Sequence, residues 1–197
     1  YGLGANPEFL REGAALDDFL HSARIVVGGV DTRSGEVLEE LYRPLGVRIL
    51  QVDPSTAEMI KSTSNALLAT LISFSNEMAE ICERLVGVDV ADVLKAVHLD
   101  HRLSPELNGR RISPEILAYL WAGCGYGGSC LPKDVRTLIA GADDLGYSAP
   151  LLKAVDEVNN SQAGHLVSRA ENALGGLRGR KVALLGLAFK SGTDDLR

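Results

Sequence analysis

The first 52 residues carry the hydrophobic pattern of two buried strands joined by a helix. Residues 24–28 form a short β-branched run, and residues 47–52 form a second one. Between them, residues 32–45 have the apolar spacing of a helix. The apolar stripe of that helix consists of Val37, Leu41 and Leu45. A strand, a helix and a strand with short joins predict part of a parallel α/β sheet. Residues 6–20 are expected to form a loop that leads into a short helix.

From residue 53 the apolar period changes to that of helices. Asp53-Pro54-Ser55 ends the second strand, and Ser55 with Glu58 has the form of a capping box that opens a helix. Apolar side chains then recur at steps of four and three, which predicts a long amphipathic helix to about Val86. They are Leu67, Leu71, Phe74, Met78, Ile81 and Leu85. A helical middle of this kind is suited to dimerisation.

The remaining pattern predicts three further helices, a long loop and a last strand. Residues 90–97 have a short helical pattern, whereas residues 98–114 are polar, arginine-rich and interrupted by proline and glycine, which indicates a loop. Two later helices are predicted to end at Gly146 and at Gly175-Gly176. Their apolar residues are Leu138, Ile139, Ala142 and Leu145 in the first, and Leu151, Val155, Val158, Leu166, Ala170 and Leu174 in the second. Lys181–Gly186 reads as the buried first strand of a new α/β domain.

Composition and charge narrow the classes of function. The chain of 197 residues is 46% hydrophobic, which favours a sizeable core over disorder. Its net charge of −6 forms no basic stripe, so nucleic acid is not an expected partner. No apolar run approaches the roughly 20 residues that span a bilayer, and no membrane partner is expected. The sparse cysteines suit a reducing cytoplasm. The chain opens without methionine or a signal pattern, which we interpret as a start within a longer sequence.

The densest chemical signal is Gly123-Cys-Gly-Tyr-Gly-Gly-Ser-Cys-Leu-Pro-Lys-Asp134. Its four glycines within six residues allow the backbone to approach a ligand closely. Cys130 lies two residues before a proline, so we expect its thiol at a helix N-terminus, where the helix dipole favours the thiolate. Lys133 adds a positive charge, and Asp134 is four residues from Cys130, on the same side of the predicted helix, where it can orient water. This context favours a nucleophile.

Other polar residues give weaker signals. Lys61 and Asn65 are four residues apart on the long helix and can hold an oxyanion, although most such pairs are solvated surface. Glu8 and Glu12 have the same spacing, and Glu8 can act as a general base or simply begin a charged helix. Three basic residues can bind phosphate: Arg102, Arg111 and Lys190. We interpret Cys82 and Cys124 as structural, and the four histidines show no metal-ligand spacing, so no metal is expected.

Taken together, these segments resemble the UDP-glucose/GDP-mannose dehydrogenase family along essentially the whole chain. The order and separation of four segments carry the resemblance: residues 6–13, Lys61-Ser-Thr-Ser-Asn65, residues 125–134 and residues 186–197. The resemblance implies an α/β fold class with a mainly helical central dimerisation domain between two Rossmann-like parts.

The family's domain order can be laid onto this chain. Residues 1–52 would be the C-terminal part of the NAD-binding Rossmann domain, and residues 53–178 the central helical dimerisation and catalytic domain. Residues 179–197 would start the C-terminal nucleotide-sugar-binding domain. The glycine-rich cofactor fingerprint would then precede residue 1.

The resemblance also implies an activity. It is the NAD-dependent four-electron oxidation of a nucleotide sugar, most simply of UDP-glucose to UDP-glucuronate, through a cysteine thiohemiacetal and thioester. Cys130 would be the nucleophile, Lys61 and Asn65 would stabilise the oxyanion, and Asp134 with Glu8 would manage protons and water. The substrate would contact Phe9, Leu10, Arg11, Glu12, Lys61, Asn65, Arg102, Tyr119, Gly123, Gly125, Tyr126, Gly127 and Lys190. NAD would lie near Glu12, Cys130, Lys133 and Arg197. A homodimer through the central helices is expected.

Some positions depart from the family pattern, and alternatives remain open. Trp121 stands where a polar or basic residue is usual, and Ser191 where proline or lysine is common. The loop of residues 102–113 is longer than in many members. Either Arg102 or Arg111 could serve the partner subunit's site, and Arg102 is favoured because it follows Leu99-Asp-His.

The first alternative in function is a different sugar, either GDP-mannose or a UDP-N-acetylhexosamine. A second is a non-catalytic dimerisation module that keeps the motifs. A third is another cysteine enzyme, such as an acyl transferase, which would need a histidine base that no sequence feature nominates. As an isolated piece, the chain is expected to bind no NAD and to turn over nothing.

Overall fold

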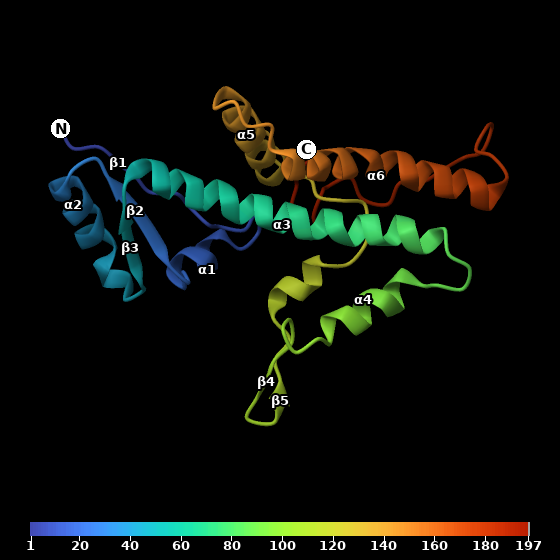
Figure 1. The fold of residues 1–197 in the computed structure, drawn as a ribbon, viewed down its shortest axis with the longest axis horizontal. Coiled ribbons are helices and arrows are strands. Elements are labelled where there is room, and N and C mark those ends of the chain that lie inside the picture. The colour runs from blue at the N-terminus through green and yellow to red at the C-terminus, as the bar shows by residue number, and fades with distance from the viewer. Residues whose placement is uncertain (197) are drawn as a thin grey trace. The chain divides into compact units, whose positions relative to one another are not determined.

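The protein is described by a computed structural model that covers residues 1–196 and divides into two compact units (Figure 1). The first unit holds Tyr1–Asn65 and Ala188–Leu196, and the second holds Ala66–Leu187. The predicted fold class is confirmed, since an α/β part is followed by a mainly helical part. The domain boundaries given above stay predictions.

The first unit contains the parallel strands that the sequence predicts. Strand β2 (Ile25–Gly29) pairs in parallel with β3 (Ile49–Val52), with Ile25 opposite Ile49. Helix α2 (Thr32–Tyr42) and the 3-10 turn η1 (Arg43–Leu45) connect them. A short strand not predicted from the sequence, β1 (Gly4–Ala5), pairs antiparallel with β2 and completes the order β1-β2-β3. Val26 and Val27 in the central strand are fully buried.

The apolar stripe predicted for α2 is not the face that covers the sheet. Val37 and Leu41 are exposed, whereas Gly35 is the buried residue of this helix. A Cβ at Gly29 would overlap the backbone nitrogen of Gly35, so two glycines let the helix lie directly on β2. Backbone proximity, which hydrophobic spacing does not encode, therefore selects the buried face.

Two helices begin in the first unit, and the second of them, which continues into the second unit, has a different cap from the predicted one. Helix α1 (Ala15–Leu20) follows the loop, and α3 (Pro54–Glu83) follows β3. The capping box predicted at Ser55 is wrong, because the carboxylate of Asp53 accepts from the Thr56 N–H at 2.9 Å. The Thr56 hydroxyl also donates to this carboxylate and, with that N–H, holds the pKa of Asp53 below its usual value. Asp53 as N-cap before Pro54 is the arrangement that proline favours at a helix start.

In the second unit, α3 buries mostly small and polar side chains, together with Ile72. The core contains Ala66, Ala69 and Ile72 from α3. The residues predicted as the apolar stripe are mostly exposed: Leu67 58%, Phe74 51%, Ile81 47% and Leu85 53%. The helix also ends at Glu83, three residues before the predicted end. An uncovered apolar row therefore remains on α3.

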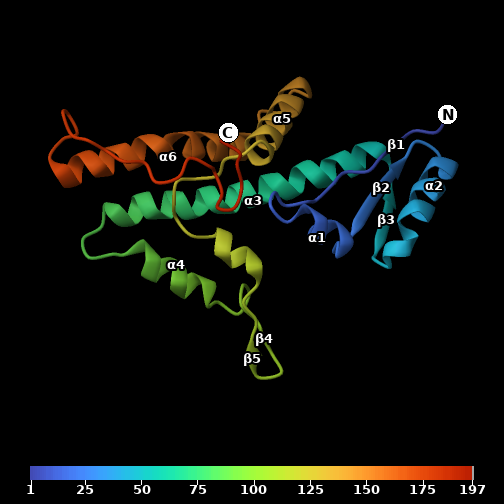
Figure 2. The ribbon, with the colours of Figure 1, turned by 180° about the vertical axis from the view of Figure 1, so that it is seen from behind.

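The other helices of the second unit are α4 (Val90–His98), the 3-10 turn η2 (Glu115–Tyr119), α5 (Cys130–Asp144) and α6 (Pro150–Leu174). Both views show α6 lying alongside α3 (Figures 1 and 2), and the Ser73 hydroxyl donates to the Val155 carbonyl at 3.1 Å. The predicted end of α6 is confirmed, since Gly175 adopts a left-handed conformation at its C-cap. No helix in residues 1–196 is long and apolar enough to cross a membrane.

Two predicted segments differ from the structure. The loop predicted at 98–114 contains a hairpin of β4 (Glu106–Leu107) and β5 (Arg110–Arg111). Asn108 and Gly109 both have positive φ, which is the Asn-Gly turn that closes two-residue hairpins, and this signal was missed. The strand predicted at 181–186 is absent from the described structure. Leu184 and Leu185 are exposed there, because no strand within residues 1–196 pairs with this segment.

Candidate functional site

Asn6 connects the loop of residues 6–13 to the strand and the helix beside it in the first unit. Its amide nitrogen donates to the Val26 carbonyl at 2.7 Å, and its amide oxygen accepts from the Tyr42 hydroxyl at 2.6 Å. One side chain thus joins the loop to β2 and to α2. The sequence did not single out Asn6 or Tyr42 for this role, because no local spacing relates them.

Glu8 and Lys61 are brought together although they are 53 residues apart. The Lys61 ammonium donates to one Glu8 oxygen at 3.1 Å, and the other oxygen accepts from the Leu10 N–H at 2.7 Å. The Lys61 side chain is only 19% exposed, whereas that of Glu8 is 55% exposed. The mostly buried cation can stabilise a developing oxyanion, and the solvated carboxylate beside it can accept a proton.

Phe9 lies under the same cation. The Lys61 nitrogen is 5.6 Å from the centroid of the Phe9 ring, within the range of a cation–π interaction. Asn65 follows one turn later on α3 and has polar interactions of its own. Glu8, Phe9, Lys61 and Asn65, all of them predicted site residues, therefore belong to one compact unit.

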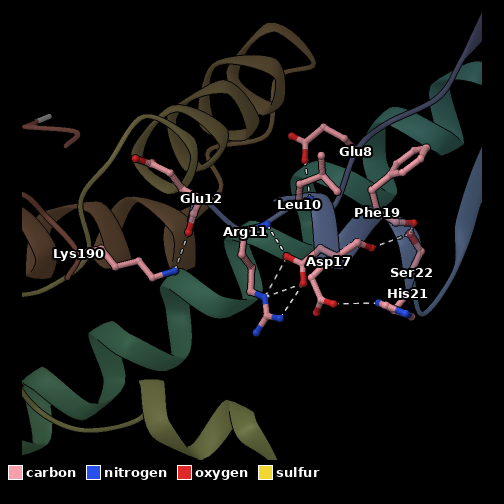
Figure 3. Close-up of polar contacts among 10 residues, drawn as sticks. Glu8, Leu10, Arg11, Glu12, Asp17, Phe19, His21, Ser22 and Lys190 are labelled. Carbon is pink, nitrogen blue, oxygen red and sulfur yellow. Dashed lines mark hydrogen bonds and ion pairs between the residues drawn. The ribbon is translucent and has the colours of Figure 1, made fainter. Parts of the chain in front are cut away.

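Arg11 is turned towards α1, where it binds Asp18 (Figure 3). Its guanidinium contacts the carboxylate at 2.7 and 3.0 Å, and its backbone N–H donates to the same group at 2.7 Å. The hydrogen bond from the Arg11 side chain is the largest cause that holds the pKa of Asp18 below its usual value. The structure thus gives Arg11 a role in holding the loop, beside the substrate contact predicted for it.

Lys190 lies beside the same loop although 178 residues separate it from Glu12 (Figure 3). Its ammonium donates to the backbone oxygen of Glu12 at 3.0 Å, so the contact does not use the Glu12 carboxylate. The Thr193 hydroxyl donates to the Lys190 carbonyl at 2.8 Å and closes a local turn. The structure thus brings these two predicted site residues together within the first unit.

In the second unit, Cys130 is the first residue of α5 and is exposed. Its sulfur lies 3.7 Å from the hydroxyl oxygen of Ser129, the N-cap residue. Ser129 makes no side-chain capping hydrogen bond, so it does not compete for the first N–H groups of the helix. Those N–H groups and the helix dipole favour negative charge at this end. The structure therefore places the thiol as the sequence predicts.

Asp134 lies one turn into α5 and is only 3% exposed. The Lys133 ammonium donates to its carboxylate at 2.5 Å. A buried carboxylate requires such a partner, because desolvation without one is costly. Lys133, predicted near NAD, thus neutralises the carboxylate predicted to orient water.

The glycine loop before Cys130 is fixed by two asparagines. The Gly123 N–H donates to the Asn76 amide oxygen at 2.7 Å. Asn159 accepts from the Tyr126 N–H at 2.8 Å and donates to the Tyr126 carbonyl at 3.1 Å. Gly125 has a φ of 89°, and a Cβ there would overlap the Asn159 amide oxygen. Sequence reasoning missed both asparagines. A polar residue on the packed face of a helix is the signal that can find them.

Tyr126, predicted as a substrate contact, is part of the core of the second unit. Its side chain is buried, and this burial raises the pKa of its phenol to about 12. Its hydroxyl has no hydrogen-bond partner among the described residues. A substrate would therefore meet the backbone of this residue before its ring.

The two candidate arginines of the long loop differ in their contacts. The Arg111 guanidinium donates to the Leu99 carbonyl at 2.7 Å and to the Ser104 carbonyl at 3.1 Å, so it holds the base of the hairpin. Arg102 binds the Asp100 carboxylate at 2.6 Å, and its side chain is 88% exposed. This bidentate contact keeps the pKa of Asp100 well below its usual value. The geometry leaves Arg102 the more accessible of the two.

Two aromatic residues follow this loop. Tyr119, at the end of η2, is 38% exposed, and Trp121 is 42% exposed. The Trp121 ring packs edge-on against His98, with the ring centroids 4.8 Å apart. The His98 nitrogen Nε2 lies 3.1 Å from the Leu120 carbonyl oxygen.

The described residues offer neither a metal cluster nor a histidine base for Cys130. No group of three or more His, Cys, Asp or Glu in residues 1–196 could hold a metal ion. Within the same residues, the contact of the Cys130 thiol is with Ser129, and no histidine contacts it.

Neither the start of α2 nor the backbone beside Gly28 forms a cradle for the pyrophosphate of NAD. The N-terminus of α2 is capped by Asp31, whose carboxylate accepts from the Ser34 N–H at 2.7 Å. A carboxylate at this position would repel a pyrophosphate, which binds at uncapped helix starts. The space beside Gly28 is filled by Pro54 and Ala57. Arg197, predicted near NAD, lies outside the described residues.

Comparison with known proteins gives a consistent assignment. Residues 1–46 match the NAD-binding domain of the UDP-glucose/GDP-mannose dehydrogenase family, and residues 55–161 match its central domain. The UDP-glucose 6-dehydrogenase YwqF of Bacillus subtilis is 47% identical over 195 residues, which cover 99% of this chain and 41% of the relative.

Solved structures agree with the sequence relatives. A UDP-glucose dehydrogenase of Pyrobaculum islandicum has a TM-score of 0.87 at 43% identity. The match covers 100% of this chain and 42% of the Pyrobaculum chain. A UDP-D-ManNAc dehydrogenase of Pyrococcus horikoshii has a TM-score of 0.79 at 26% identity, and the match covers 100% of this chain and 44% of the Pyrococcus chain. The chain spans about two fifths of the length of these relatives. The match to the family's central domain covers more than half of the residues of this chain. The chain therefore belongs to the UDP-glucose/GDP-mannose dehydrogenase family.

Proposed function

We propose that the whole protein oxidises carbon six of UDP-glucose to a carboxylate with NAD as the hydride acceptor, and that Cys130 forms the covalent intermediate. The observation that carries this proposal is the exposed Cys130 thiol at the uncapped start of α5. The similarity to UDP-glucose 6-dehydrogenases, at 40% to 47% identity, favours UDP-glucose over the other nucleotide sugars.

The proposed chemistry proceeds through sulfur. The C6 alcohol is first oxidised to an aldehyde, and the Cys130 thiolate then adds to the carbonyl carbon, so that a C–S bond forms and the oxygen takes the electron pair and a proton. NAD supplies the hydride acceptor for both oxidations, the second of which turns the thiohemiacetal into a thioester. Water then attacks the thioester, the C–S bond breaks, and the thiolate leaves with the carboxylate formed.

The other residues of the chain have supporting roles in this proposal. The Lys61 ammonium and the Asn65 amide would stabilise the oxyanions that precede and follow the thioester. Glu8, whose carboxylate is half exposed, would take the proton of the attacking water, and Asp134 would orient that water. Removal of one oxyanion donor commonly lowers kcat about 10²- to 10³-fold. The position of the Lys61 ammonium, mostly shielded from solvent and 3.1 Å from the Glu8 carboxylate, supports its assignment as that donor.

The experiment that tests the function counts NADH formed per sugar consumed. The full-length protein, given UDP-glucose and NAD+, is expected to form two NADH for each UDP-glucuronate. GDP-mannose and UDP-N-acetylmannosamine, tested at equal concentration, are expected to react at least tenfold more slowly in kcat/KM, a difference of about 1.4 kcal/mol. A single NADH per sugar would exclude the double oxidation, and a faster reaction with another sugar would replace UDP-glucose as the substrate.

We also propose that the exposed apolar row on α3 forms a homodimer interface. Leu67, Phe74 and Ile81 recur every seven residues, and the half-buried Leu71 and Met78 continue the row between them. This is the spacing with which two helices pack along a seam. An uncovered row of this length on a long helix favours a second copy over solvent, since contiguous exposed apolar surface marks interfaces.

Phe74→Glu is expected to weaken this dimer about 30-fold in Kd, because a buried charge would face the apolar seam. Sedimentation equilibrium measures the change. Leu145→Glu is the matched control, since Leu145 at the end of α5 is 87% exposed and lies off the row. Equal dissociation constants for Phe74→Glu and the parent would exclude α3 as the interface.

A further inference from the structure

Arg24 lies on the ring of Phe9, beside the pair of Lys61 and Glu8. Its guanidinium carbon is 4.2 Å from the centroid of the Phe9 ring, closer than the Lys61 nitrogen at 5.6 Å. A planar guanidinium at this distance stacks on an aromatic ring more firmly than an ammonium does. Phe9 therefore has two cations on its ring, and Arg24 is the nearer one.

Arg24 is also connected to the helix that carries Lys61. Its Nη2 group donates to the Ser64 hydroxyl at 3.4 Å, and that hydroxyl donates to the Ile60 carbonyl at 2.7 Å. Ser64 lies three residues after Lys61 and one before Asn65 on α3. Arg24 thus joins the start of β2, the 6–13 loop through Phe9, and the turn of α3 that presents Lys61.

The same contacts limit where Lys61 can lie. Its ammonium has a fixed acceptor in Glu8, and Glu8 is adjacent to Phe9 in the loop. If Phe9 moves, the Glu8 carboxylate and the ammonium move with it. The positive charge of Arg24 has a second effect. Because the Glu8 carboxylate offsets the charge of Lys61, the guanidinium keeps the electrostatic potential around Lys61 favourable to an anion.

We infer that Arg24 is a positioning residue for the oxidation: it holds Phe9, and through Phe9 it holds Lys61 and Glu8 in the geometry that receives the oxyanion. This inference rests on the proposed function. The contacts of Arg24 are with Phe9 and Ser64, so it acts on the oxidation through Lys61 and Glu8. Its effect is therefore expected on kcat rather than on KM, because oxyanion stabilisation is realised in the transition state.

The test combines Arg24→Met, Arg24→Lys and a double-mutant cycle in the full-length protein. Arg24→Met is expected to lower kcat about tenfold with KM changed by less than about threefold, while Arg24→Lys recovers at least half of the loss. In a Lys61→Met background, Arg24→Met is expected to cause no further loss of kcat, because it acts through Lys61. Arg48→Met is the matched control, an exposed arginine just before β3.

Three results would overturn the inference. They are an unchanged kcat in Arg24→Met, the same loss of kcat in Arg24→Met and Arg24→Lys, or the same fold-loss of kcat from Arg24→Met in the parent and in the Lys61→Met background. A readout without turnover separates it from the proposed function. The rate at which acetic anhydride modifies Lys61, followed by mass spectrometry, is expected to rise at least threefold in Arg24→Met and to stay constant in Arg48→Met. A constant rate in Arg24→Met would refute the positioning role even if the protein oxidised no sugar at all.

Discussion

Cys130→Ser is expected to lower kcat of the full-length protein by about 10³-fold or more and to remove the covalent intermediate. A serine hydroxyl at the start of α5 would have no histidine base among the described residues, whereas a thiol ionises far more readily. The exposed position of residue 130 means that the substitution removes reactivity and not packing. The folded state should therefore be unaffected.

The measurement pairs NADH release with the mass of acid-quenched protein. The parent is expected to show a sugar adduct during turnover, and Cys130→Ser none. Cys124→Ser is the matched control, because Cys124 is equally a free, exposed thiol and lies six residues earlier in the same loop. If Cys130→Ser still formed two NADH per sugar, or if the adduct stayed and Cys124→Ser lost it, the assignment of the nucleophile would be wrong.

The parts of this fold that the sequence predicts are those specified by short-range pattern. Short apolar, β-branched runs at 25–29 and 49–52, the proline after Cys130 and the glycines after Leu174 are each signals that act within a few residues. The position of the thiol at a helix start follows from Pro132 alone, since proline is favoured in a first turn. The loop that leads into α1 is likewise predicted from short-range sequence pattern.

The parts that the sequence did not predict depend on contacts between distant residues. Asn159 and Tyr126 are separated by 33 residues, and Asn6 and Tyr42 by 36, so no window along the chain relates them. The exposed row on α3 has the opposite cause: Leu67 and Phe74 have core-like spacing, yet the core uses Ala66 and Ala69, where two helices approach closely. Hydrophobic spacing identifies an apolar face without identifying what covers it.

Gly125→Ala is expected to destabilise the protein by about 3 kcal/mol and to lower kcat about 100-fold. A φ of 89° costs a residue with a Cβ about 1–2 kcal/mol. The new methyl group would displace the Asn159 amide, and each of its two hydrogen bonds to Tyr126 contributes about 1 kcal/mol. Movement of this loop by about 1 Å would misplace the Cys130 thiol, which accounts for the loss of rate.

Thermal unfolding and the Asn159→Ala background separate these two causes. The midpoint should fall by about 6–12 °C for Gly125→Ala, whereas Gly164→Ala in α6 should be neutral or stabilising, because nothing lies near that position and alanine favours a helix. With Asn159 already replaced, Gly125→Ala should cost only the backbone strain, since the overlap with the amide is gone. If the full cost persisted without Asn159, the strained φ alone would explain the glycine, and Asn159 would not be what holds the loop.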